Sequence, residues 1–195
     1  MRLARWILRR AGWSFKVNLP EPLPPRCVLC VAPHTSNWDF VLGELGIRSV
    51  GMHSGFMMKD TWFFFPLGPI LRSMGGVPVK QHRSTHVSEH MVNTFGARKR
   101  LWIAITPEGT RSPNPNWHKG MLHIARDAGV PLVLAYFDYK RREMCIDRYF
   151  DMSDDPDADI VRIKHYYQGR AARYPEKFVT GLEAEPIATS APQHD

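Results

Sequence analysis

The sequence predicts an α/β protein: a single-domain sandwich in which a mostly parallel central sheet is flanked by helices, with a basic amphipathic helix at the N-terminus. The chain has 195 residues, which is enough for one domain with its own core. Its strand-like runs are apolar throughout rather than alternating, which is typical of strands buried on both faces. Helical stretches separate these runs, as the connections between parallel strands require.

The expected elements follow one another along the chain. The predicted strands are Cys27–Val31, Phe56–Met58, Val77–Val79, Leu101–Ile105 and Pro131–Phe137. The predicted helices cover about residues 37–48, 84–99, 119–128 and 156–172. The apolar stretch from Trp62 to Leu71 contains two prolines and a glycine, so it predicts an aromatic loop or a broken helix.

Residues 1–24 are expected to form the amphipathic helix and a proline-rich connector, ahead of a domain at 25–187 and a frayed tail at 188–195. Arginines alternate with Leu3, Trp6 and Ile7 in the first helix. This pattern is typical of a helix on a membrane surface, although a helix packed on the domain has a similar pattern. Neither a secretory signal nor a run long enough to span a bilayer is present. We therefore expect a peripheral protein on the cytoplasmic face of a membrane.

The charge of the chain indicates an anionic partner. The formal net charge is +7 and the pI is about 9.5. The excess of basic residues lies in residues 1–148, whereas residues 149–195 hold more acidic than basic side chains. Charge alone leaves nucleic acid, membrane lipid and phosphorylated metabolite open. No nucleic-acid-binding module or zinc-finger spacing is present, so we expect no nucleic-acid partner.

The three cysteines are too few for a disulfide scaffold. Cys27 and Cys30 have the C-x-x-C spacing, but no second pair follows them. Their side chains point to opposite faces of a strand, which favours buried thiols over a metal site.

A histidine and an aspartate stand at the junction between the first apolar strand and the helix that follows. The segment reads Ala-Pro-His-Thr-Ser-Asn-Trp-Asp and places His34 five residues before Asp39. If His34 precedes the helix, Asp39 can accept a hydrogen bond from its Nδ1–H and leave Nε2 free to take a proton from a hydroxyl. Thr35, Ser36 or Asn37 is suited to cap the helix.

A second polar group follows the strand Leu101–Ile105. The segment Pro-Glu-Gly-Thr-Arg contains Glu108, Gly109, Thr110 and Arg111. The carboxyl ends of strands in open α/β sheets bind ligands, and a guanidinium is suited to a phosphate. A solvated loop with an internal pair between Glu108 and Arg111 is a competing interpretation.

The two segments together, in this order and spacing, resemble the glycerolipid acyltransferase family, of which 1-acylglycerol-3-phosphate acyltransferase is the type member. The resemblance covers about residues 25–140. Between the motifs, Gly75–Val79 is similar to the second conserved block of the family, and Val130–Val133 is similar to the fourth. Lys59 stands where the family often has a lysine before an aromatic, proline-containing segment.

The resemblance implies that His34 is the general base and that Asp39 orients it. It implies that Glu108, Gly109, Thr110 and Arg111 form the pocket for the acceptor headgroup, with Arg111 contacting phosphate. The acyl donor would be acyl-CoA or acyl-carrier protein, as co-substrate rather than cofactor. The resemblance calls for no metal and no redox cofactor.

The second block departs from the family pattern, because Lys-Gln-His follows Val79 and the usual arginine is absent or shifted to Arg83. The resemblance implies a lysophosphatidic acid-type acceptor, and because of this departure a zwitterionic or amino-acid-based lysolipid stays open. A thioesterase or a non-catalytic membrane-binding module would also be compatible with these residues.

His82, His86 and His90 recur at helical spacing, which is more typical of a solvated or lipid-facing surface than of a metal site. The sequence leaves open the acyl-chain length, the choice of CoA or carrier protein as donor, and the oligomeric state.

Overall fold

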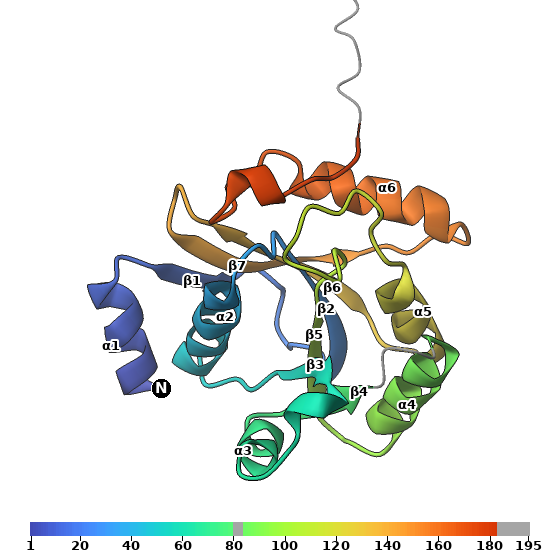
Figure 1. Cartoon of the computed structure of the whole chain (residues 1–195), viewed down its shortest axis with the longest axis horizontal. Helices are drawn as coiled ribbons and strands as arrows, with labels where there is room; N and C mark the ends of the chain where they lie inside the picture. Colours follow the sequence, from blue (N-terminus) through green and yellow to red (C-terminus); the bar gives the residue numbers. More distant parts are fainter. Residues whose placement is uncertain (80–83, 183–195) are drawn as a thin grey trace, which may run out of the picture.

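One mostly parallel sheet organises the chain (Figure 1). The computed structural model describes residues 1–79 and 84–182, and of residues 84–87 only the backbone. In these residues the sheet has seven strands in the order β1-β7-β6-β2-β5-β3-β4. Their bounds are β1 Ser14–Val17, β2 Arg26–Ala32, β3 Gly55–Lys59, β4 Gly76–Val79, β5 Leu101–Ile105, β6 Leu132–Asp138 and β7 Glu143–Phe150.

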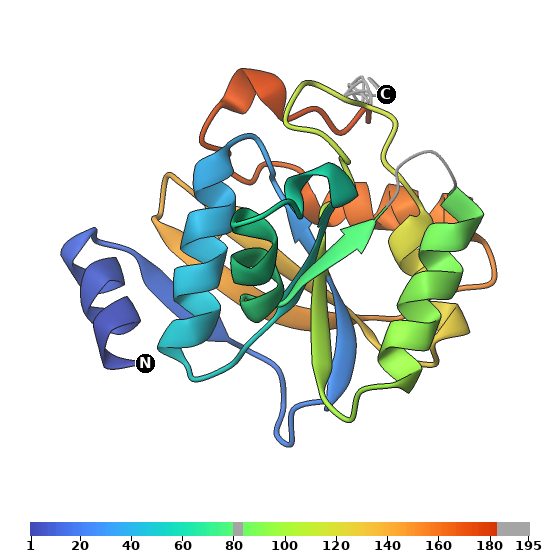
Figure 2. The same cartoon turned by 60° about the horizontal axis from the view of Figure 1, so that its bottom comes forward.

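The helices lie on both faces of this sheet (Figures 1 and 2). Their bounds are α1 Arg2–Arg10, α2 Asn37–Ser49, α3 Leu67–Ser73, α4 Ser84–Gly96, α5 Gly120–Asp127 and α6 Pro156–Tyr167, with short 3-10 turns at Asp60–Trp62 and Pro175–Lys177. All the strand neighbours except β6 and β7 are parallel. The predicted α/β class and mostly parallel sheet are confirmed.

Two strands were not expected from the sequence. We predicted only a helix and a connector over residues 1–24, and that prediction is wrong for Ser14–Val17, which form β1 at the edge of the sheet. β1 pairs with β7, the other unexpected strand, which returns antiparallel to β6 after a tight turn. These two strands stabilise each other across a large sequence separation, so no local pattern reveals them.

Several boundaries also differ. The predicted last helix ends at Tyr167 rather than at residue 172, and the stretch Trp62–Leu71 proves to be a broken helix that continues as α3. β4 contains Pro78, which an edge strand tolerates because its outer side needs no ladder hydrogen bond. The predicted tail at 188–195 lies outside the described residues.

The core is divided by the sheet into two layers. On one face, α4, α5 and α6 cover Val28, Cys30 and Ile103. On the other face, residues of α1 and α2 pack on Leu29, Val133 and Phe137. The three cysteines are free and buried, and Cys27 and Cys30 lie in opposite layers, as the strand period predicted.

Helix α1 packs on α2 but leaves part of its apolar surface open. Ala4 and Leu8 are buried, and Nη2 of Arg5 donates to the carbonyl of Ser49 at 3.0 Å. Leu3 and Trp6 are 69% and 60% exposed. Helix α1 therefore packs on the domain, which is one of the two interpretations of its sequence, and it also keeps Leu3 and Trp6 exposed to solvent. No helix in the described part of the chain is long and apolar enough to cross a membrane.

Candidate active site

Parallel pairing of β2 with β5 brings the two polar motifs together. Cys30 of β2 lies beside Ile105 of β5, so the carboxyl ends of these two parallel strands are neighbours. The His34 segment follows the first strand and the Glu108 segment follows the second. Residues 74 positions apart in the sequence thus meet at the carboxyl ends of neighbouring strands, where open α/β sheets bind ligands.

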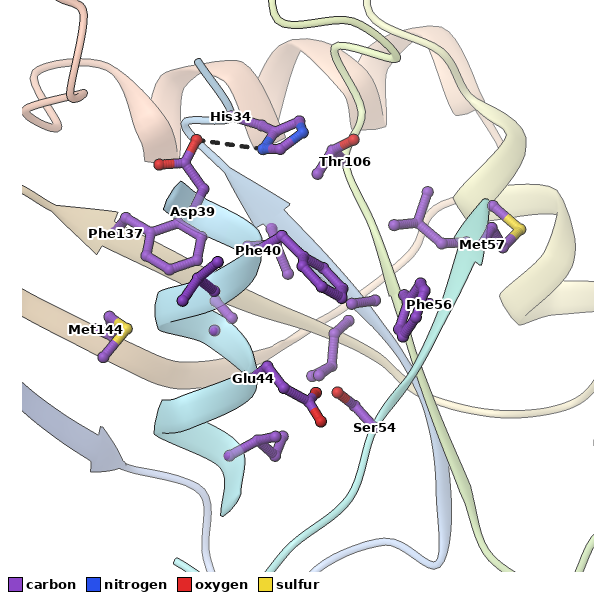
Figure 3. Close-up of a pocket in the computed structure, with 18 of the residues that line it drawn as sticks. His34, Asp39, Phe40, Glu44, Ser54, Phe56, Met57, Thr106, Phe137 and Met144 are labelled. Atoms are coloured by element: carbon purple, nitrogen blue, oxygen red, sulfur yellow. Dashed lines mark ion pairs between the residues drawn. The ribbon is translucent and has the colours of Figure 1, made fainter. Parts of the chain in front are cut away.

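His34 and Asp39 form the expected pair (Figure 3). Nδ1 of His34 lies 3.2 Å from Oδ2 of Asp39, and the imidazole side chain is 21% exposed. Helix α2 begins only at Asn37, so His34 stands before the helix, the arrangement that this spacing required. Asp39 therefore orients the ring through Nδ1 and leaves Nε2 for a hydroxyl.

Asp39 is held by a dense set of donors. Oδ2 accepts from the backbone N–H groups of Thr35 and Ser36, each at 2.8 Å, and the side chain is 1% exposed. Ser36 is the N-cap of α2 and completes a capping box with Asp39. The hydroxyl of Tyr139 donates to Oδ1. The same carboxylate therefore starts the helix and fixes the histidine.

Glu108 is buried against the loop that carries His34 and does not face an open headgroup pocket. The residue is 4% exposed, and Oε1 accepts from the backbone N–H of His34 at 2.9 Å. Oε2 is buried without a hydrogen-bond partner among the described residues. Burial raises the pKa of this carboxyl to about 7, and the charge of Asp39 adds to the effect. This position indicates a positioning role in place of the headgroup contact that the resemblance implied.

The rest of the second motif lies at the surface. Nη1 of the exposed Arg111 donates to Oδ1 of Asn37, which links the two motifs a second time. Gly109 has φ +66, and a Cβ at this position would lie 2.4 Å from Cδ2 of His118. The glycine therefore makes room for an imidazole ring and for an unusual backbone conformation. Thr110 is exposed, and its Oγ1 accepts from the N–H of Ser112.

A cavity of about 550 Å³ opens beside the pair and extends between α2 and the sheet. Its lining includes His34, Asp39, Lys59, Gly109 and Arg111. Most of the remaining wall is apolar, with the side chains of Val31, Phe40, Phe56, Phe137, Met144 and Ile146. Glu108 and Thr110 are not part of the lining, and Arg83 lies outside the described residues.

Two contributors to the site carried no sequence signal for their role. Tyr139 follows β6, one hundred residues after Asp39, and nothing local marks it as a partner of that carboxylate. The sequence predicts Asn37 only as one of three candidate helix caps, whereas Ser36 caps the helix and Asn37 accepts from Arg111. Among the described side chains, no group of three histidines, cysteines or carboxylates is arranged to hold a metal ion.

The raised pKa of Glu108 predicts a pH dependence of stability. Between its ordinary pKa and about 7, the folded protein holds a proton on Glu108 that the unfolded chain has released. The stability from this group is therefore present at low pH and is lost as the pH rises through about 7. We expect the free energy of unfolding to fall from about pH 5 to about pH 8 by up to about 3 kcal/mol more in the wild type than in Glu108→Gln. Urea unfolding at both pH values measures the difference.

Glu176→Gln is the matched control, because Glu176 is exposed. It should keep the pH dependence of the wild type. The same slope in Glu108→Gln as in the wild type would show that the buried carboxyl is not the group responsible.

Comparison with known proteins identifies the family. The family model described as Acyltransferase matches residues 14–137, which contain both motifs and most of the sheet. No curated protein matches the chain. The crystal structure of the 1-acyl-sn-glycerophosphate (LPA) acyltransferase PlsC from Thermotoga maritima is similar, with a TM-score of 0.55 and 19% sequence identity. The match covers 89% of this chain and 80% of that chain, and it shows a shared fold. Because the family match spans well over half of its length, the chain belongs to the acyltransferase family.

Proposed function

We propose that this acyltransferase moves a fatty acyl group from a thioester, acyl-CoA or acyl-carrier protein, to the hydroxyl of a lysophospholipid similar to 1-acylglycerol-3-phosphate, as a step of phospholipid biosynthesis. The observation that carries the proposal is the position of the His34–Asp39 pair at one end of an apolar cavity with two cations, Lys59 and Arg111, in its lining. An apolar cavity suits an acyl chain, and the cations suit a phosphate.

The proposed reaction uses both residues of the pair. Nε2 of His34 takes the proton of the acceptor hydroxyl while its oxygen attacks the thioester carbonyl. The new C–O ester bond forms, the C–S bond breaks, and the imidazolium returns the proton to the leaving thiolate. Asp39 stabilises the imidazolium through Nδ1, and no metal or redox cofactor takes part in these steps.

His34→Ala tests the base. We expect acyl transfer to fall by about 10²–10⁴-fold because proton removal in the transition state is lost, while the fold is kept. The measurement follows thiol release from acyl-CoA with and without a panel of lysolipids and identifies the lipid product. His123→Ala, an exposed histidine on α5, is the control that should keep the rate. Thiol release that does not depend on any lysolipid would instead indicate a thioesterase.

Arg111→Ala tests the headgroup contact. Arg111 is exposed in the lining of the cavity, so its loss should remove a binding interaction rather than the base. We expect the acceptor KM to rise about tenfold or more with kcat largely kept, for an acceptor that carries a phosphate. Arg100→Ala removes an exposed arginine outside the lining and should leave the KM unchanged. An unaltered acceptor KM in Arg111→Ala would contradict the assignment.

An anionic membrane surface is the proposed location of the reaction, on the cytoplasmic side. Apolar side chains on α1, α2 and the segment around α3 remain uncovered, and these helices lie on one side of the sheet (Figure 1). The exposed set comprises Leu3, Trp6, Trp38, Val41, Trp62, Phe64, Phe65 and Ile70. Arg2, Arg9 and Arg10 of α1 are exposed beside them. Apolar side chains with neighbouring arginines suit a bilayer interface with anionic lipid.

Phe64→Ser combined with Phe65→Ser tests this surface, because the two rings are 57% and 87% exposed. We expect binding to phosphatidylglycerol vesicles in a cosedimentation assay to weaken about tenfold or more, since the variant loses two large apolar side chains. Val161→Ser, on α6 at the other face of the sheet, is the control and should bind normally. Equal binding by the double variant and the wild type would rule out a contact through this segment.

A further inference from the structure

The two oxygens of the Asp39 carboxylate have unequal sets of donors. Oδ2 accepts from the backbone N–H groups of Thr35 and Ser36 and lies 3.2 Å from Nδ1 of His34. Oδ1 accepts from the hydroxyl of Tyr139, and no other donor to this oxygen occurs among the described residues. The terminal torsion of an aspartate is soft, so the hydrogen bond at Oδ1 fixes the plane of the carboxylate and the direction in which Oδ2 faces the imidazole.

Tyr139 is held in place by contacts from three segments. Its backbone N–H donates to the carbonyl of Ala171 at 2.8 Å, which ties the turn between β6 and β7 to the segment after α6. Its ring meets the ring of Trp13 edge to face, with centroids 4.9 Å apart. The turn itself is closed by Asp138, whose Oδ1 accepts from the backbone N–H of Arg141 at 3.0 Å. The phenol is therefore presented by a backbone and a ring that are both fixed.

The hydroxyl of Tyr139 keeps its proton near neutral pH. Burial raises the pKa of Tyr139, and the hydrogen bond to Asp39 raises it further, whereas the nearby Arg173 opposes these effects only in part. An ionised carboxylate can only accept hydrogen bonds, so the phenol is the donor. The contact at Oδ1 is thus a charge-assisted hydrogen bond, which is stronger than one between neutral groups.

We propose that Tyr139 is a positioning residue for acyl transfer: its hydroxyl holds the plane of the Asp39 carboxylate and thereby keeps His34 oriented for proton transfer. This inference rests on the proposed function, in which His34 is the base. Tyr139 acts through Asp39, because it is not part of the lining of the cavity. It also lies beyond residues 14–137, so the family match assigns it no role.

Tyr139→Phe tests the proposal, because it removes the hydroxyl and keeps the ring that packs on Trp13. We expect the fold to be kept, which thermal unfolding followed by circular dichroism checks. The kcat of acyl transfer should fall about tenfold or more, because Oδ1 loses its donor and the pair its fixed orientation. The KM values for acyl-CoA and for lysophosphatidic acid should stay unchanged, since Tyr139 lines no part of the cavity. Steady-state kinetics measures all three quantities.

The imidazole of His34 provides a second readout that does not depend on turnover. Long-range proton–nitrogen NMR spectra distinguish the two neutral tautomers of a histidine, and His34→Ala assigns the signals of this ring. The wild type should show the Nδ1–H tautomer, because Nδ1–H donates to Asp39. In Tyr139→Phe we expect these signals to shift toward a mixture of the two tautomers, since Oδ2 no longer faces Nδ1 in a fixed plane.

Tyr166→Phe is the matched control. The hydroxyl of Tyr166 donates to Oδ2 of Asp147 at 2.9 Å, so this variant loses the same kind of hydrogen bond to a different carboxylate. Tyr166 lies on α6 and is not part of the lining of the cavity. The control should keep the kcat, both KM values and the imidazole signals of the wild type.

The outcomes separate this inference from the proposed function. A lower kcat with unchanged KM values and altered imidazole signals in Tyr139→Phe supports the positioning role. An unaltered kcat, a raised KM in its place, or unaltered imidazole signals overturns that role while leaving acyl transfer intact. A wild-type enzyme that transfers no acyl group from any thioester overturns the proposed function itself, and with it the role of Tyr139 in the reaction.

Discussion

The parallel pairing of β2 with β5 is the constraint on which the rest of the site depends. It aligns Cys30 with Ile105, so the carboxyl ends of the two strands lie side by side. The segments that leave these ends are then joined by two contacts, Glu108 to the N–H of His34 and Arg111 to Asn37. The chemistry of the site is therefore a consequence of strand register.

Helix α2 connects the His34–Asp39 pair to the cavity. Its first turn contains Asp39, which accepts from backbone donors and from Tyr139 while it orients His34. Its inner face then provides Phe40 and Glu44 to the wall of the cavity. Because one helix carries Asp39, Phe40 and Glu44, helix geometry fixes their spacing along the cavity.

Two buried carboxylates accept hydrogen bonds from the backbone of the loop that carries His34, and their environments differ. Asp39 accepts from three hydrogen-bond donors and lies beside the imidazole, so both of its oxygens have partners. Glu108 has a single donor and a buried oxygen without a partner among the described residues, so burial dominates and its pKa rises to about 7. The aspartate is thus suited to stabilise a positive imidazolium, whereas the glutamate supports the backbone of the loop.

The sequence by itself determined the α/β class, the five apolar strands, the start of α2 near Asn37 and the residue types of both motifs, because each of these follows from a local period or spacing. The tertiary structure alone decided the rest. β1 and β7 depend on each other across the sheet, and Tyr139 reaches Asp39 from one hundred residues away. Glu108 is on a loop that the sequence describes as polar, yet packing buries it. Burial, register and cavity shape arise from contacts between distant segments, which no local pattern encodes.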